Sequence, residues 1–157
     1  MDSLFVPQIL EHQQNRFPLL FIDRIDDLIP GESATGVKNF TYNEWFFPAH
    51  FEGNPSVPGF VLIESLVQTF IMTFLSIPEH KGKQTSFIKL NNATFQKKIV
   101  PGEQLVIRAK LDTFKRGLAI GSASGFVDGS LAVSADFVIA LPDVLAKFNP
   151  SSGLDQK

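Results

Sequence analysis

The sequence predicts an α+β fold in which a strongly curved antiparallel sheet wraps around one long central helix. The first observation is an apolar segment over residues 56–77, which is hydrophobic on nearly all sides and therefore needs cover from the rest of the chain. The second is a succession of Val-, Ile- and Phe-rich runs, long or alternating, that read as strands. The third is the turn chemistry between these runs, of which Asp128-Gly129 is the strongest hairpin signal.

The individual elements follow from the same patterns. A short helix is expected over 4–13, before Phe17-Pro18 interrupts it, and an aromatic-rich loop is expected over 41–55. Ser56 is expected to cap the long helix, with Pro58 in its first turn. The expected strands are 19–28, 32–40, 85–97, 104–115, 118–127 and 130–141.

Length and composition limit the possible functions. The 157 residues predict a single domain over 1–147, followed by a flexible C-terminal tail over 148–157. A net charge of −2 offers nothing that attracts nucleic acid or an anionic membrane. The absence of cysteine excludes disulfides, thiolate zinc sites and a cysteine nucleophile, and no spacing of His, Asp and Glu suggests a metal. The first residues carry no basic, apolar leader pattern, so a cytoplasmic location is expected.

The long apolar helix is interpreted as a buried helix rather than a membrane span. Its length would just cross a bilayer, but Glu64 and Gln68 would then lie well inside the hydrocarbon, where a carboxylate is costly. The 16 phenylalanines indicate either a well-filled core or a pocket for an apolar ligand, and composition does not separate the two.

The strongest chemical signal is the stretch that enters this helix. His50 lies in a Gly- and Pro-rich loop, Pro58 and Gly59 open the helix, and Glu64 is the only acid in its apolar body. A possible base, backbone N–H donors and a possible acid therefore fall close together. Each also has a purely structural interpretation: His50 as a loop residue bonded to backbone, Gly59 as a tight helix entry, and Glu64 as a buried acid bonded to Gln68 or to a partner chain.

Five sequence blocks resemble one known family, the (3R)-hydroxyacyl-[acyl-carrier-protein] dehydratases of the FabZ type. RFPLLFIDR resembles the family's RYPFLLVDR, KNFTYNE its KNVTxNE, and AHFEGNPSVPG its GHFPGxPxMPG. LIESLVQ resembles LxEALAQ, and FQKKIVPGEQL resembles FxxPVxPGDxL. These blocks occur in the family's order, and together they are far more specific than any one of them.

The resemblance implies the hot-dog fold and a dehydratase in fatty-acid, polyene or related lipid biosynthesis. His50 and Glu64 would be the catalytic base and acid, with Gly59, Gln68, Phe51 and Pro58 around the thioester oxygen and the substrate. The substrate would arrive on the 4′-phosphopantetheine arm of acyl carrier protein, with no other cofactor. The family also implies a homodimer or a trimer of dimers, with the histidine and the acid of one site coming from different subunits.

The departures from the family pattern keep other functions open. The family's His-Arg-Tyr is Asn15-Arg16-Phe17 here, and an aromatic residue at the acyl-tunnel entrance is Ser86. The glycine before His50 is alanine, the proline after Phe51 is glutamate, and a further family proline is Lys98. A hot-dog thioesterase, a thioester hydratase working in reverse, and a non-catalytic subunit that pairs with an active homologue remain alternatives.

A docking surface for the acidic carrier is also expected. Basic residues are concentrated in the second half of the chain, and Lys97, Lys98 and Arg116 are expected to frame the mouth of the acyl tunnel. The alternative is that these residues are ordinary solvated side chains on strand faces.

Overall fold

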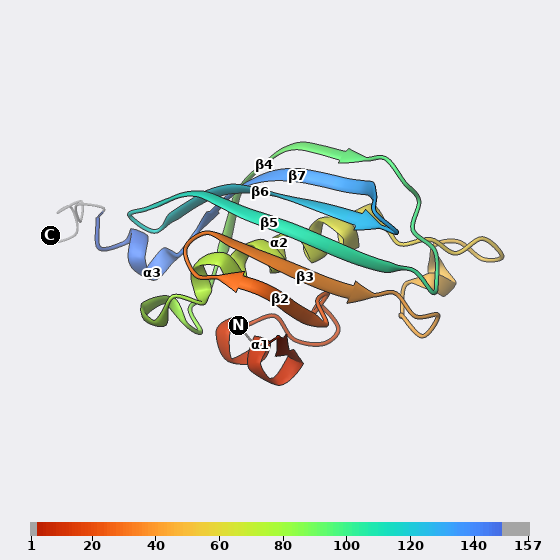
Figure 1. Ribbon diagram of the computed structural model, residues 1–157, viewed down its shortest axis with the longest axis horizontal. Helices are drawn as coiled ribbons and strands as arrows, with labels where there is room; N and C mark the ends of the chain where they lie inside the picture. Colours follow the sequence, from red (N-terminus) through yellow and green to blue (C-terminus); the bar gives the residue numbers. More distant parts are fainter. Residues whose placement is uncertain (1–2, 149–157) are drawn as a thin grey trace, which may run out of the picture.

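The computed structural model describes residues 3–148, in which seven antiparallel strands form one sheet that curves around the helix α2, Gly59–Leu75 (Figure 1). The strand order is β1-β2-β3-β5-β6-β7-β4, which leaves β1 and β4 as the two edges. The strands are β1 Leu4–Phe5, β2 Arg24–Ile29, β3 Ser33–Asn39, β4 Ser86–Phe95, β5 Gln104–Lys115, β6 Leu118–Val127 and β7 Ser130–Ala140. This arrangement confirms the predicted α+β architecture.

Helix α2 is the centre of the molecule. Thirteen of its 17 residues are buried, because β3, β5, β6 and β7 cover one side of it and fill the space with aromatic and aliphatic side chains. The partly exposed residues Phe60, Ile63 and Glu64 lie together near its N-terminal end. The sheet therefore leaves uncovered the part of the helix that carries its only acid.

The helix is shorter than the 56–77 predicted. It begins at Gly59 because Pro58 is extended, and the N–H groups of Val61 and Leu62 bond to the Pro58 carbonyl. Ser56 does not cap it, since its hydroxyl lies 3.3 Å from Nδ1 of His50 instead. The helix ends at Leu75, three residues before Pro78, which starts a short 3₁₀ turn over Pro78–His80.

The hairpin predictions are confirmed, but the first strand differs. At Asp128-Gly129 both residues have positive φ (48° and 77°), as a tight type I′ hairpin requires. The predicted strand 19–28 starts only at Arg24, because its first residues bond to a helix side chain: the Leu19 carbonyl and the Phe21 N–H both pair with the amide of Gln68. The remaining strands fall within a few residues of their predicted bounds.

Two glycines allow α2 to approach the sheet closely. A Cβ added at Gly36 on β3 would overlap the side chain of Thr69. A Cβ at Gly121 on β6 would lie 2.6 Å from the ring of Phe70 and 2.1 Å from the carbonyl oxygen of Lys110 on β5. Gly36 therefore has no room for a side chain unless the helix moves, and Gly121 has none unless the neighbouring strand moves as well.

Short elements close the two ends of the described chain. The predicted N-terminal helix 4–13 is divided into β1, which pairs with β2, and the helix α1, Val6–His12. After β7 a single helical turn, α3, covers Pro142–Leu145. The tail predicted over 148–157 lies outside the described residues from 149 onward. Across residues 3–148, no helix is long and apolar enough to cross a membrane.

Candidate active site

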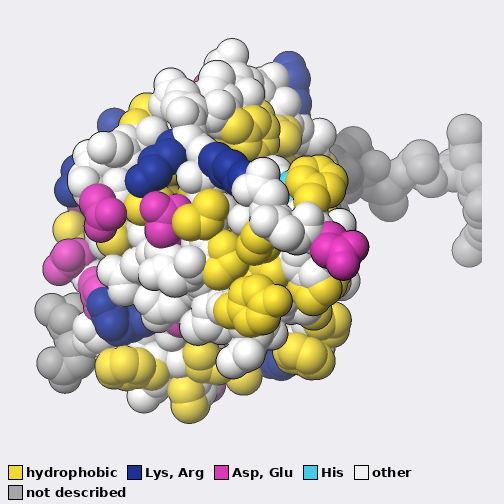
Figure 2. All heavy atoms as spheres, turned by 90° about the vertical axis from the view of Figure 1, so that its right-hand side faces the viewer, with side chains coloured by type: hydrophobic (Ala, Val, Ile, Leu, Met, Phe, Trp, Pro, Cys, Tyr) yellow, Lys and Arg dark blue, Asp and Glu magenta, His cyan; other side chains and the backbone are white. Residues whose placement is uncertain are grey.

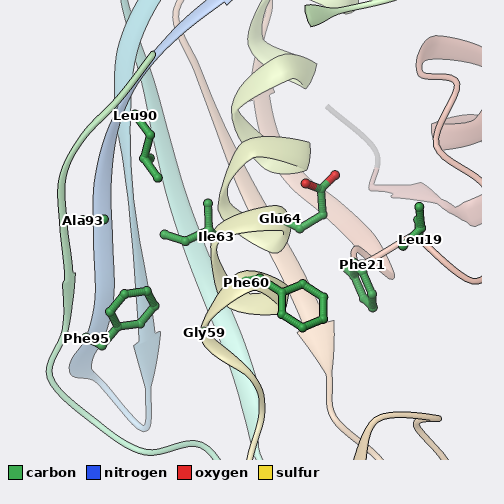
Figure 3. Close-up of a pocket in the computed structure, with 9 residues that line it drawn as sticks. All are labelled: Leu19, Phe21, Gly59, Phe60, Ile63, Glu64, Leu90, Ala93 and Phe95. Carbon is green, nitrogen blue, oxygen red and sulfur yellow. The ribbon is translucent and has the colours of Figure 1, made fainter. Parts of the chain in front are cut away.

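A cavity of about 590 Å³ lies beside the first turns of α2, between β4 and the segment that leads into β2 (Figure 3). Its lining residues are Leu19, Phe21, Gly59, Phe60, Ile63, Glu64, Leu90, Ala93 and Phe95. Glu64 is the one ionisable side chain among these residues, and Figure 3 shows its carboxyl group projecting from the helix on the side of Leu19 and Phe21. A cavity with apolar walls and one acid suits an apolar chain that ends in a reacting group.

The environment of Glu64 favours its protonated form. Burial of the carboxyl raises its pKa above the ordinary value, and a hydrogen bond from Gln68 lowers it by a smaller amount. The protonated fraction of Glu64 therefore extends to higher pH than that of an exposed glutamate. This is the property required of a general acid.

A hydrogen-bond network determines which oxygen of Glu64 can carry the proton. The Phe21 N–H donates to Oε1 of Gln68 over 2.8 Å, so Nε2 of Gln68 faces the other way and donates to the Leu19 carbonyl and to Glu64 Oε1, both over 2.7 Å. Asn15 donates to the same Glu64 oxygen from Nδ2 over 3.3 Å. Because Oε1 accepts two hydrogen bonds, the proton of the neutral carboxyl belongs on Oε2.

The loop that carries His50 is held by its aromatic residues and by a buried cation. Phe46 and Phe47 are fully buried, and their rings pack edge-on at 4.8 Å. Lys38 at the end of β3 is 5% exposed and contacts both Glu44, over 2.5 Å, and Asp23, over 3.3 Å. The pair between Lys38 on β3 and Glu44 in the loop holds the start of the loop against the sheet.

His50 has a defined tautomer when it is neutral. Its Nδ1 lies 2.9 Å from the carbonyl oxygen of Ser56, which can only accept, so Nδ1 carries the hydrogen. Nε2 is then left with a free lone pair, as a base requires. The Phe51 ring stacks on the imidazole at 4.1 Å between ring centres, and the peptide bond between the two residues is cis.

Gly59 contributes the first N–H group of α2 to the cavity wall. The first N–H groups of a helix have no partner within it, and the helix dipole adds positive potential there. A Cβ at Gly59 would lie 3.2 Å from the Phe95 ring, so the position has little room for a side chain. An N–H group at this place could stabilise an oxygen that gains negative charge in the cavity.

The structure separates the predicted site residues into two groups. Glu64 and Gly59 line the cavity, and Gln68 is fully buried behind Glu64, where its amide is occupied by the network. In the described part of the chain, His50 and Phe51 do not line this cavity. Pro58 is buried at the helix start, next to Gly59. One copy of the chain therefore does not bring the predicted base to the wall that holds the predicted acid.

Sequence reasoning missed the contact of Asn15 with Glu64, because 49 residues separate the two in the chain and Asn15 stood out only as a departure from the family pattern. No local pattern could have found it.

The expectation that Lys97, Lys98 and Arg116 frame one mouth is wrong. Lys97 and Lys98 lie beside Gly59 and Phe95, and Lys98 bonds to Asn54 over 2.7 Å. Arg116 lies beyond the far end of β5, whose 12 residues span roughly 40 Å.

The end of the molecule that holds the His50 loop shows clustered hydrophobic side chains with basic groups beside them (Figure 2). Exposed aromatic residues at this end include Trp45, Phe51 and Phe60, each about half exposed or more. Within residues 3–148, no group of three His, Asp or Glu side chains could hold a metal ion.

Comparison with known proteins agrees with this geometry. The FabA-like domain matches residues 14–136 of the chain. The protein "3-hydroxyacyl-[acyl-carrier-protein] dehydratase FabZ" of Ligilactobacillus salivarius is 38% identical over 141 residues, which cover 90% of this chain and 99% of that protein. Its counterpart in Clostridium novyi is 38% identical over 139 residues, covering 88% and 98%. The chain belongs to the FabZ-type dehydratase family.

Solved structures show the fold of this FabZ-type protein. The dehydratase heterocomplex ApeI:P from Xenorhabdus doucetiae has a TM-score of 0.74 at 11% identity, covering 85% of this chain and 90% of that one. The protein PH1136 from Pyrococcus horikoshii has a TM-score of 0.66 at 11% identity, covering 90% and 95%. The predicted hot-dog fold is confirmed.

Proposed function

We propose that this FabZ-type protein removes water from (3R)-hydroxyacyl thioesters on acyl carrier protein and releases trans-2-enoyl thioesters. The observation that carries the proposal is Glu64, a half-buried acid with a raised pKa in an otherwise apolar cavity. Its relatives carry the name of this activity. The product would enter fatty-acid or related lipid biosynthesis in the cytoplasm.

Each group has one role in the elimination. Nε2 of His50 takes the proton from C2, and the electron pair of that C–H bond forms the C2–C3 double bond as the C3–O bond breaks. Oε2 of Glu64 donates its proton to the leaving hydroxyl, so that water departs. Negative charge that develops on the thioester oxygen is stabilised by the Gly59 N–H at the helix terminus. His50 then holds one proton more and Glu64 one fewer, and a proton exchange restores both.

The active unit is a homodimer in which the partner's histidine loop completes the site. Support comes from β4, an edge strand that pairs with β7 on one side and with no described strand on the other. It exposes Phe87, Ile88, Leu90 and Phe95, each at least 41% exposed. A long edge strand with exposed apolar side chains favours pairing with another chain. The same edge borders the cavity, where a base is missing from one copy.

The acyl carrier protein is the partner that delivers the substrate. Lys97 and Lys98 lie at the Gly59 end of the cavity, where an acidic carrier would place the thioester. No cofactor beyond the carrier's phosphopantetheine arm enters the reaction, because the elimination transfers only protons and needs no electron acceptor.

The test is to incubate the protein in heavy water with (3R)-hydroxyacyl and, separately, with enoyl carrier thioesters. The products are then identified by mass spectrometry. We expect loss of one water from the hydroxyacyl substrate, its addition to the enoyl substrate, and deuterium at C2 in the hydrated product. Release of free acid would instead identify a thioesterase, and no conversion of either thioester would leave a non-catalytic subunit.

A further inference from the structure

The two sides of the cavity differ in what they offer an acyl chain. On the C-terminal side of Glu64 the helix face is closed by Gln68, which is fully buried and bonds to the backbone of the segment that leads into β2. On the opposite side β4 supplies three apolar side chains, which are Leu90, Ala93 and Phe95 (Figure 3). An acyl chain whose reacting carbons lie at Glu64 would therefore extend past Ile63 of α2 towards β4.

Strand β4 contains one extra residue at this wall. Asn91 and Thr94 of β4 are three residues apart. Their partners in β7, Asp136 and Ser134, are only two residues apart. Within this interval Asn92 has a φ of 51°, in the left-handed region that asparagine adopts more readily than most residues. The register shift and this backbone conformation place a β-bulge at Asn92, and a bulge bends a strand and increases its twist.

The bulge determines which side chains of β4 face the cavity. Alternate side chains of a regular strand share a face, so Leu90 and Phe95, which are five residues apart, would face opposite sides. Both line the cavity, as does Ala93, and the partners of Leu90 and Phe95 in β7 are buried in the core. A regular strand continuing from Leu90 would instead turn residue 92 into the cavity and Ala93 out of it.

Two hydrogen bonds hold the bulge on the outer face of the sheet. Nδ2 of Asn92 donates to Oδ2 of Asp136 over 2.7 Å, and the hydroxyl groups of Thr94 and Ser134 lie 2.8 Å apart. Asp136 and Ser134 face away from the core, because they alternate with buried residues of β7. The side chain of Asn92 is therefore held outside the cavity, and the methyl group of Ala93 takes the place on the inner face.

We propose that this bulge gives the protein a preference for long acyl chains over short ones, with Asn92 as a positioning residue. Ala93 is the smallest side chain that β4 contributes to the cavity, and it lies between the larger Leu90 and Phe95. The space beside its methyl group accepts the part of an acyl chain that extends beyond the reacting carbons. This inference rests on the proposed dehydratase function and specifies its substrate class.

The test measures kcat/KM for (3R)-hydroxyacyl pantetheine thioesters of increasing chain length. Ala93→Leu fills the space, so we expect a loss of at least about tenfold for long chains, the effect of a methylene group that an apolar pocket cannot accept. The shortest chains should react at the native rate. Asn92→Val should have the same effect, because a β-branched residue is unfavourable at a φ of 51° and a regular strand would turn the valine into the cavity.

Two further variants separate the bulge from a general disturbance of β4. Asn92→Gly should keep the native preference, since glycine adopts positive φ readily. Asn91→Val is the matched control, because Asn91 is one position away and pairs with Asp136 on the outer face. It should also keep the preference, and sedimentation of every variant checks that the oligomeric state is unchanged. An equal shift in Asn91→Val and Asn92→Val, or no shift in Asn92→Val, would overturn the role of the bulge.

A binding measurement separates this inference from the proposed function. Calorimetry with unreactive pantetheine thioethers, one with a short and one with a long alkyl chain, reports the preference without turnover. Dehydration in which Ala93→Leu treats long chains as the native protein does would overturn the inference and leave the dehydratase intact. Binding of the long chain that weakens in Ala93→Leu, in a protein that dehydrates nothing, would retain the inference and refute the dehydratase.

Discussion

Gln68 and Glu64 lie one turn apart on α2 and share a hydrogen bond of 2.7 Å from Gln68 Nε2 to Glu64 Oε1. The bond stabilises the ionised carboxylate, while burial opposes ionisation and has the larger effect on the pKa. The same Gln68 amide also pairs with the backbone of Leu19 and Phe21. One side chain therefore sets the orientation of the acid, tunes its pKa and fixes the wall of the cavity.

Replacing Gln68 should move the basic limb of the pH–rate profile to higher pH. The acid must be protonated, so activity falls as pH rises through the pKa of Glu64, and Gln68→Leu removes the bond that lowers this pKa. The measurement is kcat/KM against pH. Thr73→Val, which removes a buried hydroxyl of α2 that bonds to Phe70, is the matched control and should leave the limb in place. A limb that moves to lower pH would contradict this account.

Glu64→Gln should abolish most turnover while keeping the network, because the amide oxygen can still accept from Asn15 and Gln68. A general acid of this kind contributes about 10²–10⁴-fold, so the loss in kcat should fall in that range. A native circular dichroism spectrum is the control for folding. Near-native dehydration by this variant would exclude Glu64 as the acid.

The same variant should become more stable relative to the native chain as pH rises. Because the folded-state pKa of Glu64 is raised, the native fold loses stability between the unfolded pKa, about 4.3, and the higher folded pKa. Thermal unfolding of both proteins at about pH 5 and about pH 8 measures this difference. A constant difference in Tm would argue against the raised pKa.

Mixed dimers should show whether two chains share each site. His50→Ala and Glu64→Gln homodimers should both be inactive, but a heterodimer of the two contains one site with both native groups. Mixing them under conditions that exchange subunits should therefore restore up to about half of the activity per heterodimer, since one of its two sites is intact. If the mixture stays inactive after exchange is confirmed by mass spectrometry, base and acid come from the same chain.

The sequence predicted the elements whose signals are local. The Asp128-Gly129 turn and the long apolar helix needed only neighbouring residues, and both formed. The strand predicted from residue 19 failed because its early backbone groups pair with Gln68, a contact across 47 or more residues that no local alternation reveals. Asn15 was missed for the same reason.

The error over the basic residues has a different cause. Lys98 and Arg116 are close in sequence, but a strand carries the chain about 3.3 Å per residue, so the length of β5 places them at opposite ends of the sheet. The predicted strand already contained that information. Only the family resemblance implied that His50 and Glu64 of one chain belong to different sites. The pattern of residues in a single chain does not show which site a residue joins when two chains associate.

Gly59→Ala should lower kcat through crowding with Phe95. The added Cβ would lie 3.2 Å from the ring, so the helix start or the ring must shift by a few tenths of an ångström. Steady-state rates of Gly59→Ala and of Gly59→Ala combined with Phe95→Leu measure the effect. Recovery in the double variant would show that crowding with Phe95 causes the loss, and no recovery would contradict this account.

Lys38→Met should destabilise the fold, because it leaves the carboxylate of Glu44, 19% exposed, without its cation, although Asp23 keeps the hydrogen bond from the Asn39 N–H. Since both carboxylates are partly exposed, the loss should fall below the roughly 3–5 kcal/mol that breaking a fully buried pair costs, but above about 1 kcal/mol. Lys81→Met breaks the exposed pair with Glu11 and should change stability by less than about 1 kcal/mol. Urea denaturation of both variants is the measurement, and similar losses in the two would refute the special role of Lys38.

The close contacts of Gly36 and Gly121 with α2 limit how this protein can change its substrate range. The helix forms one wall of the cavity, and a side chain at Gly36 would push the helix away from β3, while one at Gly121 would collide with both Phe70 and the Lys110 carbonyl of β5. Substitutions can therefore change the width of the cavity without moving the helix only at its other two walls. Leu19 lies on one of these walls, and Leu90 and Phe95 lie on the other. Substitutions at these residues would admit acyl chains of different width while Glu64 keeps its position relative to the sheet. Selection for new acyl substrates would therefore change these side walls and leave the position of the acid unchanged.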